Sequence, residues 1–151
     1  MNIEQLRIEL EQDEGCKYEI YLDHLGLPTY GIGHLVTKDD PEYGQEVGTA
    51  VSESRVAEVF EQDIAITLDE CERLYSGFQD FPEEVQLICA NLMFNMGRPR
   101  LSGFKKFNAA LADDDWQTAA DELVDSRYYR QVTNRAERLV TRMRNVDKLY
   151  G

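Results

Sequence analysis

A long run of regularly spaced apolar residues near the middle of the chain constrains the fold most. From about Glu53 to Tyr75, apolar side chains recur at helical spacing: Val56, Val59, Phe60, Ile64, Leu68, Cys71 and Tyr75. Ser52 stands directly before this run and is a suitable N-cap. A single helix of this length would span about 34 Å at 1.5 Å per residue. The run therefore predicts a helix that connects two lobes.

Further helices are predicted on both sides of this connector. A first helix is expected over residues 2–14, with Gly15 just past its end. After the connector, Val85–Met96 is apolar nearly all round, which is typical of a buried core helix, and Pro82 fits the first helical position. Three more helices are predicted over Ser102–Ala112, Trp116–Val124 and Asn134–Lys148. The part of the chain that follows the connector is thus expected to be a helical lobe.

A short β-hairpin is predicted between the first helix and the connector. Tyr18–Tyr21 reads as a strand, residues 24–28 as a turn, and Thr29–Ile32 as a second strand. Gly31 and Gly33 fall in or beside the second strand, which indicates a close approach of the backbone to another group. The expected fold class is α+β and mostly helical, with a small β-hairpin lobe.

Two carboxyl groups flank the predicted first strand. Glu14 precedes it, Asp23 follows it, and the hydroxyl of Thr29 comes shortly after. Two carboxyls in different environments are the minimum equipment for splitting a glycosidic bond. An extended chain would separate them by about 30 Å, whereas the reaction needs about 5–9.5 Å, so the chain must bend between them, and Gly15 offers a place. The alternative is that both are solvated surface groups, as most acidic residues are.

The segment 13–34, DEGCKYEIYLDHLGLPTYGIGH, resembles the phage-type lysozymes, the T4-lysozyme-like endolysins of glycoside hydrolase family 24. Matching motifs continue in order along nearly the whole chain: Phe60–Asp63, Asn91–Gly97, Gly103–Phe104, Trp116, Ser126–Gln131 and Thr133–Ala136. The resemblance implies one lysozyme-like, two-lobed domain over residues 1–151. Its parts are an N-terminal lobe at about 13–58, a connecting helix at about 53–75, and a C-terminal helical lobe at about 76–151 together with helix 2–14.

The resemblance also implies catalytic roles. Glu14 resembles the general acid that protonates the leaving glycosidic oxygen, and Arg135 resembles the arginine that pairs with this acid. Asp23 resembles the carboxylate that orients and activates a water molecule, which Thr29 helps to hold. The family inverts configuration at the anomeric carbon, which suits carboxyls far enough apart to admit water.

Other residues resemble groups that bind substrate or stabilise the fold. Leu35 and Phe94 occupy positions that line the sugar cleft in similar enzymes. His34 and Asp63 resemble a buried ion pair without a chemical role. No second histidine lies near His34 in the sequence, so a structural histidine is favoured over a metal ligand. The resemblance implies no metal and no cofactor.

The sequence departs from the family pattern in two places. The segment between Thr37 and Ser52 is shorter and is acidic and turn-rich, so one wall of the cleft is expected to be reshaped. Phe107 and Glu122 stand where the T4 enzyme has small polar cleft residues, and they are assigned no binding role.

Charge and composition restrict the partners of the chain. The net charge of −13 argues against a nucleic-acid binder, and it is also unfavourable for binding an anionic cell wall. Residues 1–97 carry 5 Lys/Arg and 21 Asp/Glu, whereas residues 98–151 carry 11 and 8. One hypothesis is that the arginines near the C-terminal end form a basic face toward the wall; the alternative is a solvated helix face. The arginines concerned are Arg127, Arg130, Arg135, Arg138, Arg142 and Arg144.

The sequence also contains features that bear on the cellular compartment. There is no apolar run of about 18 residues and no basic-then-apolar N-terminus, so neither a membrane span nor a secretory signal is expected. Cys16, Cys71 and Cys89 have no zinc spacing and are expected to be buried thiols in a reducing compartment. We therefore expect the host cytoplasm until lysis, action in the periplasm, and a separate holin for release.

The leading hypothesis is a monomeric endolysin that hydrolyses the β-1,4 bond between N-acetylmuramic acid and N-acetylglucosamine in peptidoglycan, with inversion. Alternatives are a tail-associated lysozyme for entry, a glycan-binding module without catalytic activity, and a structural helical protein. Retaining chemistry is the mechanistic alternative within the enzyme class.

Overall fold

The computed structural model describes residues 1–150, which form mostly helices and one small antiparallel sheet. The chain divides into two compact units. The first, here the N-terminal unit, comprises residues 4–66; the second, the C-terminal unit, comprises residues 1–3 and the chain from Thr67 onward. The division falls inside the long helix α2. The predicted α+β class is confirmed, whereas the predicted division into functional lobes stays a prediction.

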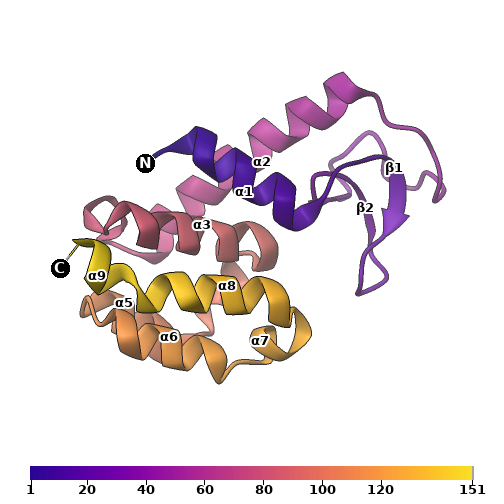
Figure 1. Cartoon of the computed structure of the whole chain (residues 1–151). Coiled ribbons are helices and arrows are strands. Elements are labelled where there is room, and N and C mark those ends of the chain that lie inside the picture. The colour runs from indigo at the N-terminus through magenta and orange to yellow at the C-terminus, as the bar shows by residue number, and fades with distance from the viewer. Residues whose placement is uncertain (151) are drawn as a thin grey trace. The chain divides into compact units, whose positions relative to one another are not determined.

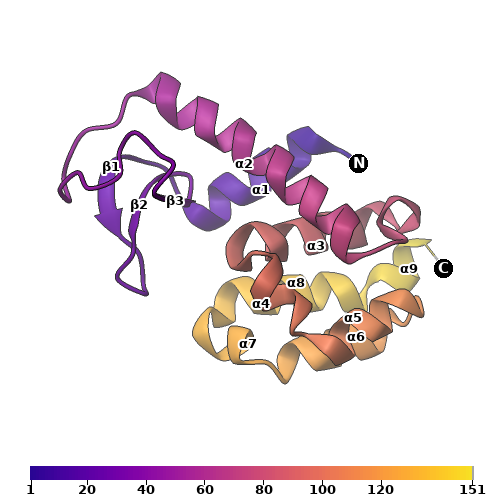
Figure 2. The same ribbon diagram turned by 180° about the vertical axis from the view of Figure 1, so that it is seen from behind.

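Most elements of the two units are labelled in Figure 1, and β3 and α4 are labelled in Figure 2. Up to the end of the long helix they are α1 (Ile3–Glu14), β1 (Lys17–Leu22), β2 (Pro28–Gly31), β3 (His34–Leu35) and α2 (Glu53–Leu74). Then follow a 3₁₀ turn η1 (Phe78–Asp80), α3 (Glu83–Met96), α4 (Arg98–Ser102), α5 (Lys105–Ala112), α6 (Trp116–Val124), α7 (Arg127–Gln131), α8 (Thr133–Arg144) and α9 (Val146–Tyr150).

The sheet of the N-terminal unit has the order β1-β2-β3, with both pairs antiparallel. Tyr21 on β1 lies opposite Thr29 on β2. The other edge of β1 is covered by residues 48–51, whose backbone bonds include Ile20 N–H to Thr49 C=O at 2.9 Å. The predicted hairpin is therefore confirmed, but β3 was missed because two residues are too few to show an alternating pattern.

The predicted end of α1 at Gly15 and the predicted start of α2 after Ser52 are both confirmed. Ser52 Oγ accepts a hydrogen bond from the Arg55 N–H at 3.1 Å, as expected for an N-cap of α2. The Gly15 N–H donates to the Glu11 carbonyl at 2.9 Å where α1 ends. These two bonds fix the points at which the chain leaves α1 and enters α2.

The core of the C-terminal unit forms around α3. Ten of its side chains are buried, as the nearly continuous apolar sequence predicts: Val85, Gln86, Leu87, Ile88, Cys89, Ala90, Asn91, Leu92, Met93 and Met96. The helix begins at Glu83, with Pro82 as its N-cap, one position later than expected. In the C-terminal unit, α6 packs against both α5 and α8, and these helices run side by side in Figures 1 and 2.

Two predicted helices of the C-terminal unit differ from the observed ones. The expected helix 102–112 begins only at Lys105, as α5, because Ser102 ends α4 and the Leu101 carbonyl accepts from the Phe104 N–H and from the Asn108 side chain. The expected helix 134–148 is interrupted at Asn145, which separates α8 from α9. Helix α7 was not predicted; Ser126 caps it by accepting from the Tyr129 N–H at 3.1 Å.

The three cysteines are free thiols. Cys71 and Cys89 are buried, and burial raises the pKa of the Cys71 thiol to about 12. Cys16 is only partly buried, so its predicted burial is wrong. Among residues 1–150, no helix combines the length and hydropathy required of a transmembrane segment.

Candidate active site

Glu14 is the last residue of α1, and its side chain lies directly against Gly33. A Cβ atom built on Gly33 would lie 2.6 Å from Glu14 Oε1 and 2.8 Å from the carboxyl carbon. Gly33 also has a φ of +64°, which L side chains rarely adopt. The close backbone approach predicted from the glycines thus occurs here, and the group approached is the candidate acid.

Asp23 follows β1 directly and is held by the turn that begins with it. Its Oδ1 atom accepts hydrogen bonds from the Leu25 N–H at 2.8 Å and from the Leu27 N–H at 2.9 Å. Two further bonds close the turn: the Asp23 N–H donates to the Leu27 carbonyl, and the Gly26 N–H donates to the Asp23 carbonyl. The carboxylate is therefore oriented by backbone amides.

Thr29 lies on β2 and is buried, with 4% of its surface exposed. Its hydroxyl donates a hydrogen bond to the Leu27 carbonyl at 3.0 Å. Asp23 and Thr29 are thus both hydrogen-bonded to the backbone of Leu27.

Tyr21 lies near both candidate catalytic carboxylates, and sequence reasoning missed it. Burial raises the pKa of the Tyr21 phenol, and the negative charges of Glu14 and Asp23 raise it further. Lys17 Nζ lies 4.3 Å from the centre of the Tyr21 ring. Glu14 and Asp23 are nine positions apart in sequence, yet both lie close enough to the Tyr21 phenol to raise its pKa.

His34 lies between two carboxylates. Its Nδ1 atom lies 2.6 Å from Asp63 Oδ2, and its Nε2 atom lies 3.0 Å from Asp40 Oδ2. Burial lowers the pKa of His34, but the hydrogen bonds and charges of Asp63 and Asp40 outweigh burial and raise it. The sequence indicated Asp63 as a partner and missed Asp40, which belongs to the acidic segment 37–52.

Arg55 of α2 contacts two carboxylates of segment 37–52, those of Glu42 and Asp40. Arg55 donates to both carboxylate oxygens of Glu42, from Nε at 3.0 Å and from a terminal nitrogen at 3.2 Å. Glu42 also accepts from the Tyr30 hydroxyl at 2.9 Å, and Arg55 lies 3.7 Å from Asp40. These contacts connect the segment to β2 and α2.

The remaining predicted site residues lie in different parts of the chain. Leu35 is exposed on β3, in the N-terminal unit, and Phe94 is half-buried on α3, in the C-terminal unit. Arg135 is buried on α8, where its Nε donates to Asn91 Oδ1 at 2.9 Å. The cleft roles of Leu35 and Phe94 and the pairing of Arg135 with Glu14 stay predictions.

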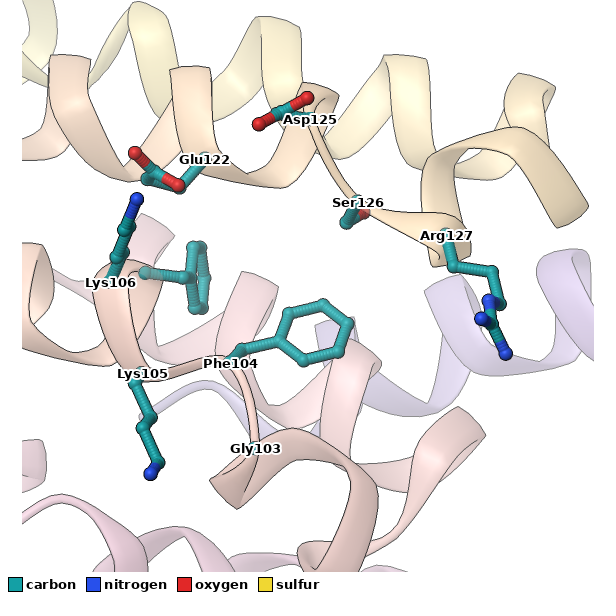
Figure 3. Close-up of a pocket in the computed structure, with 9 residues that line it drawn as sticks. Gly103, Phe104, Lys105, Lys106, Glu122, Asp125, Ser126 and Arg127 are labelled. Carbon is teal, nitrogen blue, oxygen red and sulfur yellow. The ribbon is translucent and has the colours of Figure 1, made fainter.

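A pocket of about 380 Å³ opens in the C-terminal unit, where α4 gives way to α5 and α6 to α7. Its lining includes the ring of Phe104 and charged residues of both signs. Figure 3 shows Lys106 and Glu122 pointing toward one another on one side, with Phe104 in the middle and Arg127 on the other side. Phe107 and Glu122, to which the sequence assigned no role, both line this pocket.

The hypothesis of a basic face receives limited support. Arg142 pairs with Glu84, Arg144 pairs with Asp121 at 2.8 Å, and Arg135 is buried. Arg138 also donates from Nε to the Asn134 carbonyl at 3.3 Å, so at least four of the six arginines make contacts within the C-terminal unit. Within residues 1–150, no cluster of three or more His, Cys, Asp or Glu side chains is arranged to hold a metal ion.

Comparison with known proteins gives consistent matches. The family model described as phage lysozyme matches residues 11–145. The chain is similar to "Probable T4-type lysozyme 2" of Dictyostelium discoideum, with 29% identity over 158 residues, covering 92% of this chain and 93% of that protein. It is similar to the peptidoglycan hydrolase gp36 of Pseudomonas phage phiKMV, with 28% identity over 91% of this chain and 15% of that protein. A third relative is the pre-baseplate central spike protein Gp5 of Enterobacteria phage T4, with 26% identity over 86% of this chain and 26% of that protein.

Proposed function

Because the chain belongs to the phage lysozyme family and is a glycoside hydrolase with lysozyme activity, we propose that it cleaves the β-1,4 bond between N-acetylmuramic acid and N-acetylglucosamine in peptidoglycan. We propose further that the reaction inverts the anomeric carbon. Its biological role would be host-cell lysis, after the enzyme has accumulated in the host cytoplasm as a monomer and a separate holin has released it to the periplasm.

In the proposed mechanism, a water molecule attacks the anomeric carbon while the bond from that carbon to the glycosidic oxygen breaks. The electron pair of the broken bond goes to the glycosidic oxygen, which takes the proton of Glu14. The attacking water loses a proton to Asp23, and Thr29 holds the water. General acid and general base assistance each contribute about 10²–10⁴-fold.

The observation that carries this proposal is the contrast between the two carboxyl groups. Glu14 lies at a helix end against Gly33, while one oxygen of Asp23 accepts two backbone N–H groups. The two amides hold the Asp23 carboxylate in one orientation, and a general base must be held within hydrogen-bond reach of the proton that it takes. Both carboxylates raise the pKa of the Tyr21 phenol that lies near them, which supports their cooperation at one site.

Clearing of permeabilised Gram-negative cells would test the proposal. We expect the wild type to clear a turbid suspension and Glu14→Gln to leave it turbid, because the amide has no proton to give. Glu11→Gln is the matched control, since Glu11 is exposed one turn earlier on α1. A well-folded wild type that binds walls without clearing them would instead support the glycan-binding alternative.

The stereochemistry needs a separate measurement. Proton NMR during the first minutes of hydrolysis would identify the anomer that forms first. The α-anomer is expected for inversion of a β-linkage, and a β-anomer would show that the reaction retains configuration.

A further inference from the structure

We propose that Leu27 is the positioning residue that sets both the base and the water-binding hydroxyl, through its backbone rather than its side chain. This inference rests on the proposed function of Asp23 and Thr29. The Leu27 N–H donates to Asp23 Oδ1 at 2.9 Å, and the Leu27 carbonyl accepts from the Thr29 hydroxyl at 3.0 Å. One residue therefore touches both groups that handle the water.

The bonds to Asp23 identify the carboxylate oxygen that acts as base. Oδ1 already accepts two N–H groups, from Leu25 and Leu27, so its two lone pairs in the carboxylate plane are occupied. Oδ2 is left to take the proton of the attacking water. The turn thereby fixes the rotation of the carboxylate as well as its position.

The bond from Thr29 determines the direction of its hydrogen bond to the water. A hydroxyl has one hydrogen, and in Thr29 this hydrogen is given to the Leu27 carbonyl. Thr29 Oγ1 can therefore only accept from the water. A water that donates one hydrogen to Thr29 and the other to Asp23 Oδ2 has its lone pairs free to attack the anomeric carbon.

The sequence of the turn permits this arrangement. Gly26 has a φ of +78°, a conformation that glycine adopts without strain, and its N–H donates to the Asp23 carbonyl at 2.9 Å. The side chains of Leu25 and Leu27 are 55% and 42% exposed, so they contribute little to the core. The backbone, not the leucine side chains, carries the effect.

Backbone esters in the full chain test this inference. Leucic acid at position 27 replaces the Leu27 N–H with an oxygen and removes its bond to Asp23 Oδ1. Glycolic acid at position 26 is the matched control, because it removes a bond of the same turn that does not touch the carboxylate. Leucic acid at position 25 removes the other donor and keeps the test available if the first ester fails to fold.

The readouts are kcat and KM for release of reducing ends from soluble peptidoglycan strands, together with the melting temperature. We expect the esters at positions 27 and 25 to lower kcat by about 10- to 100-fold, the value of a hydrogen bond to a charged group, with KM within about twofold. The ester at position 26 should lower the melting temperature similarly but keep kcat within about threefold.

Thr29→Val and Thr29→Ser complete the test. The valine should lose kcat because it offers no acceptor, and the serine should recover most of it. Equal kcat losses for the three esters, or a serine no better than valine, would overturn the inference. An inactive wild type, or a wild type unaffected by Glu14→Gln, would instead overturn the proposed function, so the two failures are distinguishable.

Discussion

At the scale of the residue, Gly33 determines where the carboxyl group of Glu14 can lie. We predict that Gly33→Ala lowers kcat by about 100-fold, the cost of displacing a catalytic group by about 1 Å. The new methyl group would occupy a position 2.6 Å from Glu14 Oε1, so the carboxyl must move. Reducing-end release by the purified variant, with KM determined in parallel, would measure the loss.

Gly44→Ala is the matched control for backbone strain. Gly44 has a φ of +85°, and a Cβ added there meets no atom within 4 Å. Both variants should lose about 1–2 kcal/mol of stability through the left-handed backbone, but only Gly33→Ala should lose turnover. Equal activities of the two variants at a temperature where both are folded would disprove the positioning of Glu14 by Gly33.

The sequence predicted part of this local structure. The glycines in GIGH indicated a close approach of the backbone, and the motif predicted Glu14, Asp23 and Thr29 as the catalytic residues, which stays a prediction. The partner of Gly33, the amides on Asp23 and the place of Tyr21 could not be predicted, because each depends on how a helix end and a hairpin fold back on one another. A hydrogen bond across two to four residues leaves no periodic signal in a sequence.

At the scale of the element, the segment 37–52 is held by charged groups rather than by an apolar core. Burial raises the pKa of Asp40, but the Thr37 N–H, His34 and Arg55 outweigh burial and lower it. The pKa of His34 is raised by the same contact and by Asp63. The contact between His34 and Asp40 therefore stabilises the N-terminal unit only while both groups are charged.

We predict that stability is highest between about pH 4 and pH 6.5. The His34 contribution is complete below the pKa of unfolded histidine, about 6.5, and is lost as pH rises through the raised folded value. The Asp40 contribution is complete above the pKa of unfolded aspartate, about 3.9, and is lost as pH falls through the lowered folded value. Thermal unfolding across pH 3 to 9 would show the two declines.

His34→Gln isolates the alkaline decline. The variant should melt about 2–4 °C lower near pH 6, the shift for about 1 kcal/mol in a chain of this length, and should lose little more at higher pH. His24→Gln is the control, since His24 is the other histidine and is exposed in the hairpin turn. If His34→Gln declined with pH as steeply as the wild type, another group would be responsible.

The pocket in the C-terminal unit gives a prediction about substrate binding. It carries Phe104 with Lys106, Arg127, Glu122 and Asp125, and the stem peptides of peptidoglycan carry both amino and carboxyl groups. We expect Phe104→Ala to raise KM for peptide-bearing glycan strands by about three- to tenfold, the value of one aromatic contact. KM for a peptide-free chitooligosaccharide should stay unchanged; an equal rise for both substrates would exclude a contact with the peptide.

This pocket also shows where sequence reasoning fails at the scale of elements. The sequence predicted one helix over residues 102–112 and one over residues 134–148, with no interruption inside either. The interruptions depend on bonds that compete with the helical ones, such as the Asn108 side chain donating to the Leu101 carbonyl. The pocket lies at such an interruption and could not be predicted for that reason.

At the scale of the whole molecule, the acidic charge is concentrated in the N-terminal unit. Residues 4–66 carry 15 Asp/Glu and 4 Lys/Arg, whereas the rest of the chain carries 14 and 12. The unit with the candidate catalytic residues is thus the unit that an anionic wall repels most. An acidic excess over residues 1–97 was already evident from the sequence, but the pairing of several C-terminal arginines, which limits their compensation, was not.

We therefore predict that salt accelerates wall hydrolysis at low ionic strength. Raising the ionic strength from about 0.01 M to 0.1 M shortens the Debye length from about 30 Å to 10 Å, which screens the repulsion between enzyme and wall. The rate of clearing should rise by up to about tenfold over this range.

Replacing the exposed Glu46 and Glu53 with glutamine should raise the low-salt rate and flatten the salt curve, because both charges belong to the acidic unit. A neutral chitooligosaccharide is the control substrate, and its hydrolysis should not depend on salt. A clearing rate that falls steadily with salt would mean instead that local attraction, such as a basic face on the C-terminal unit, dominates the encounter.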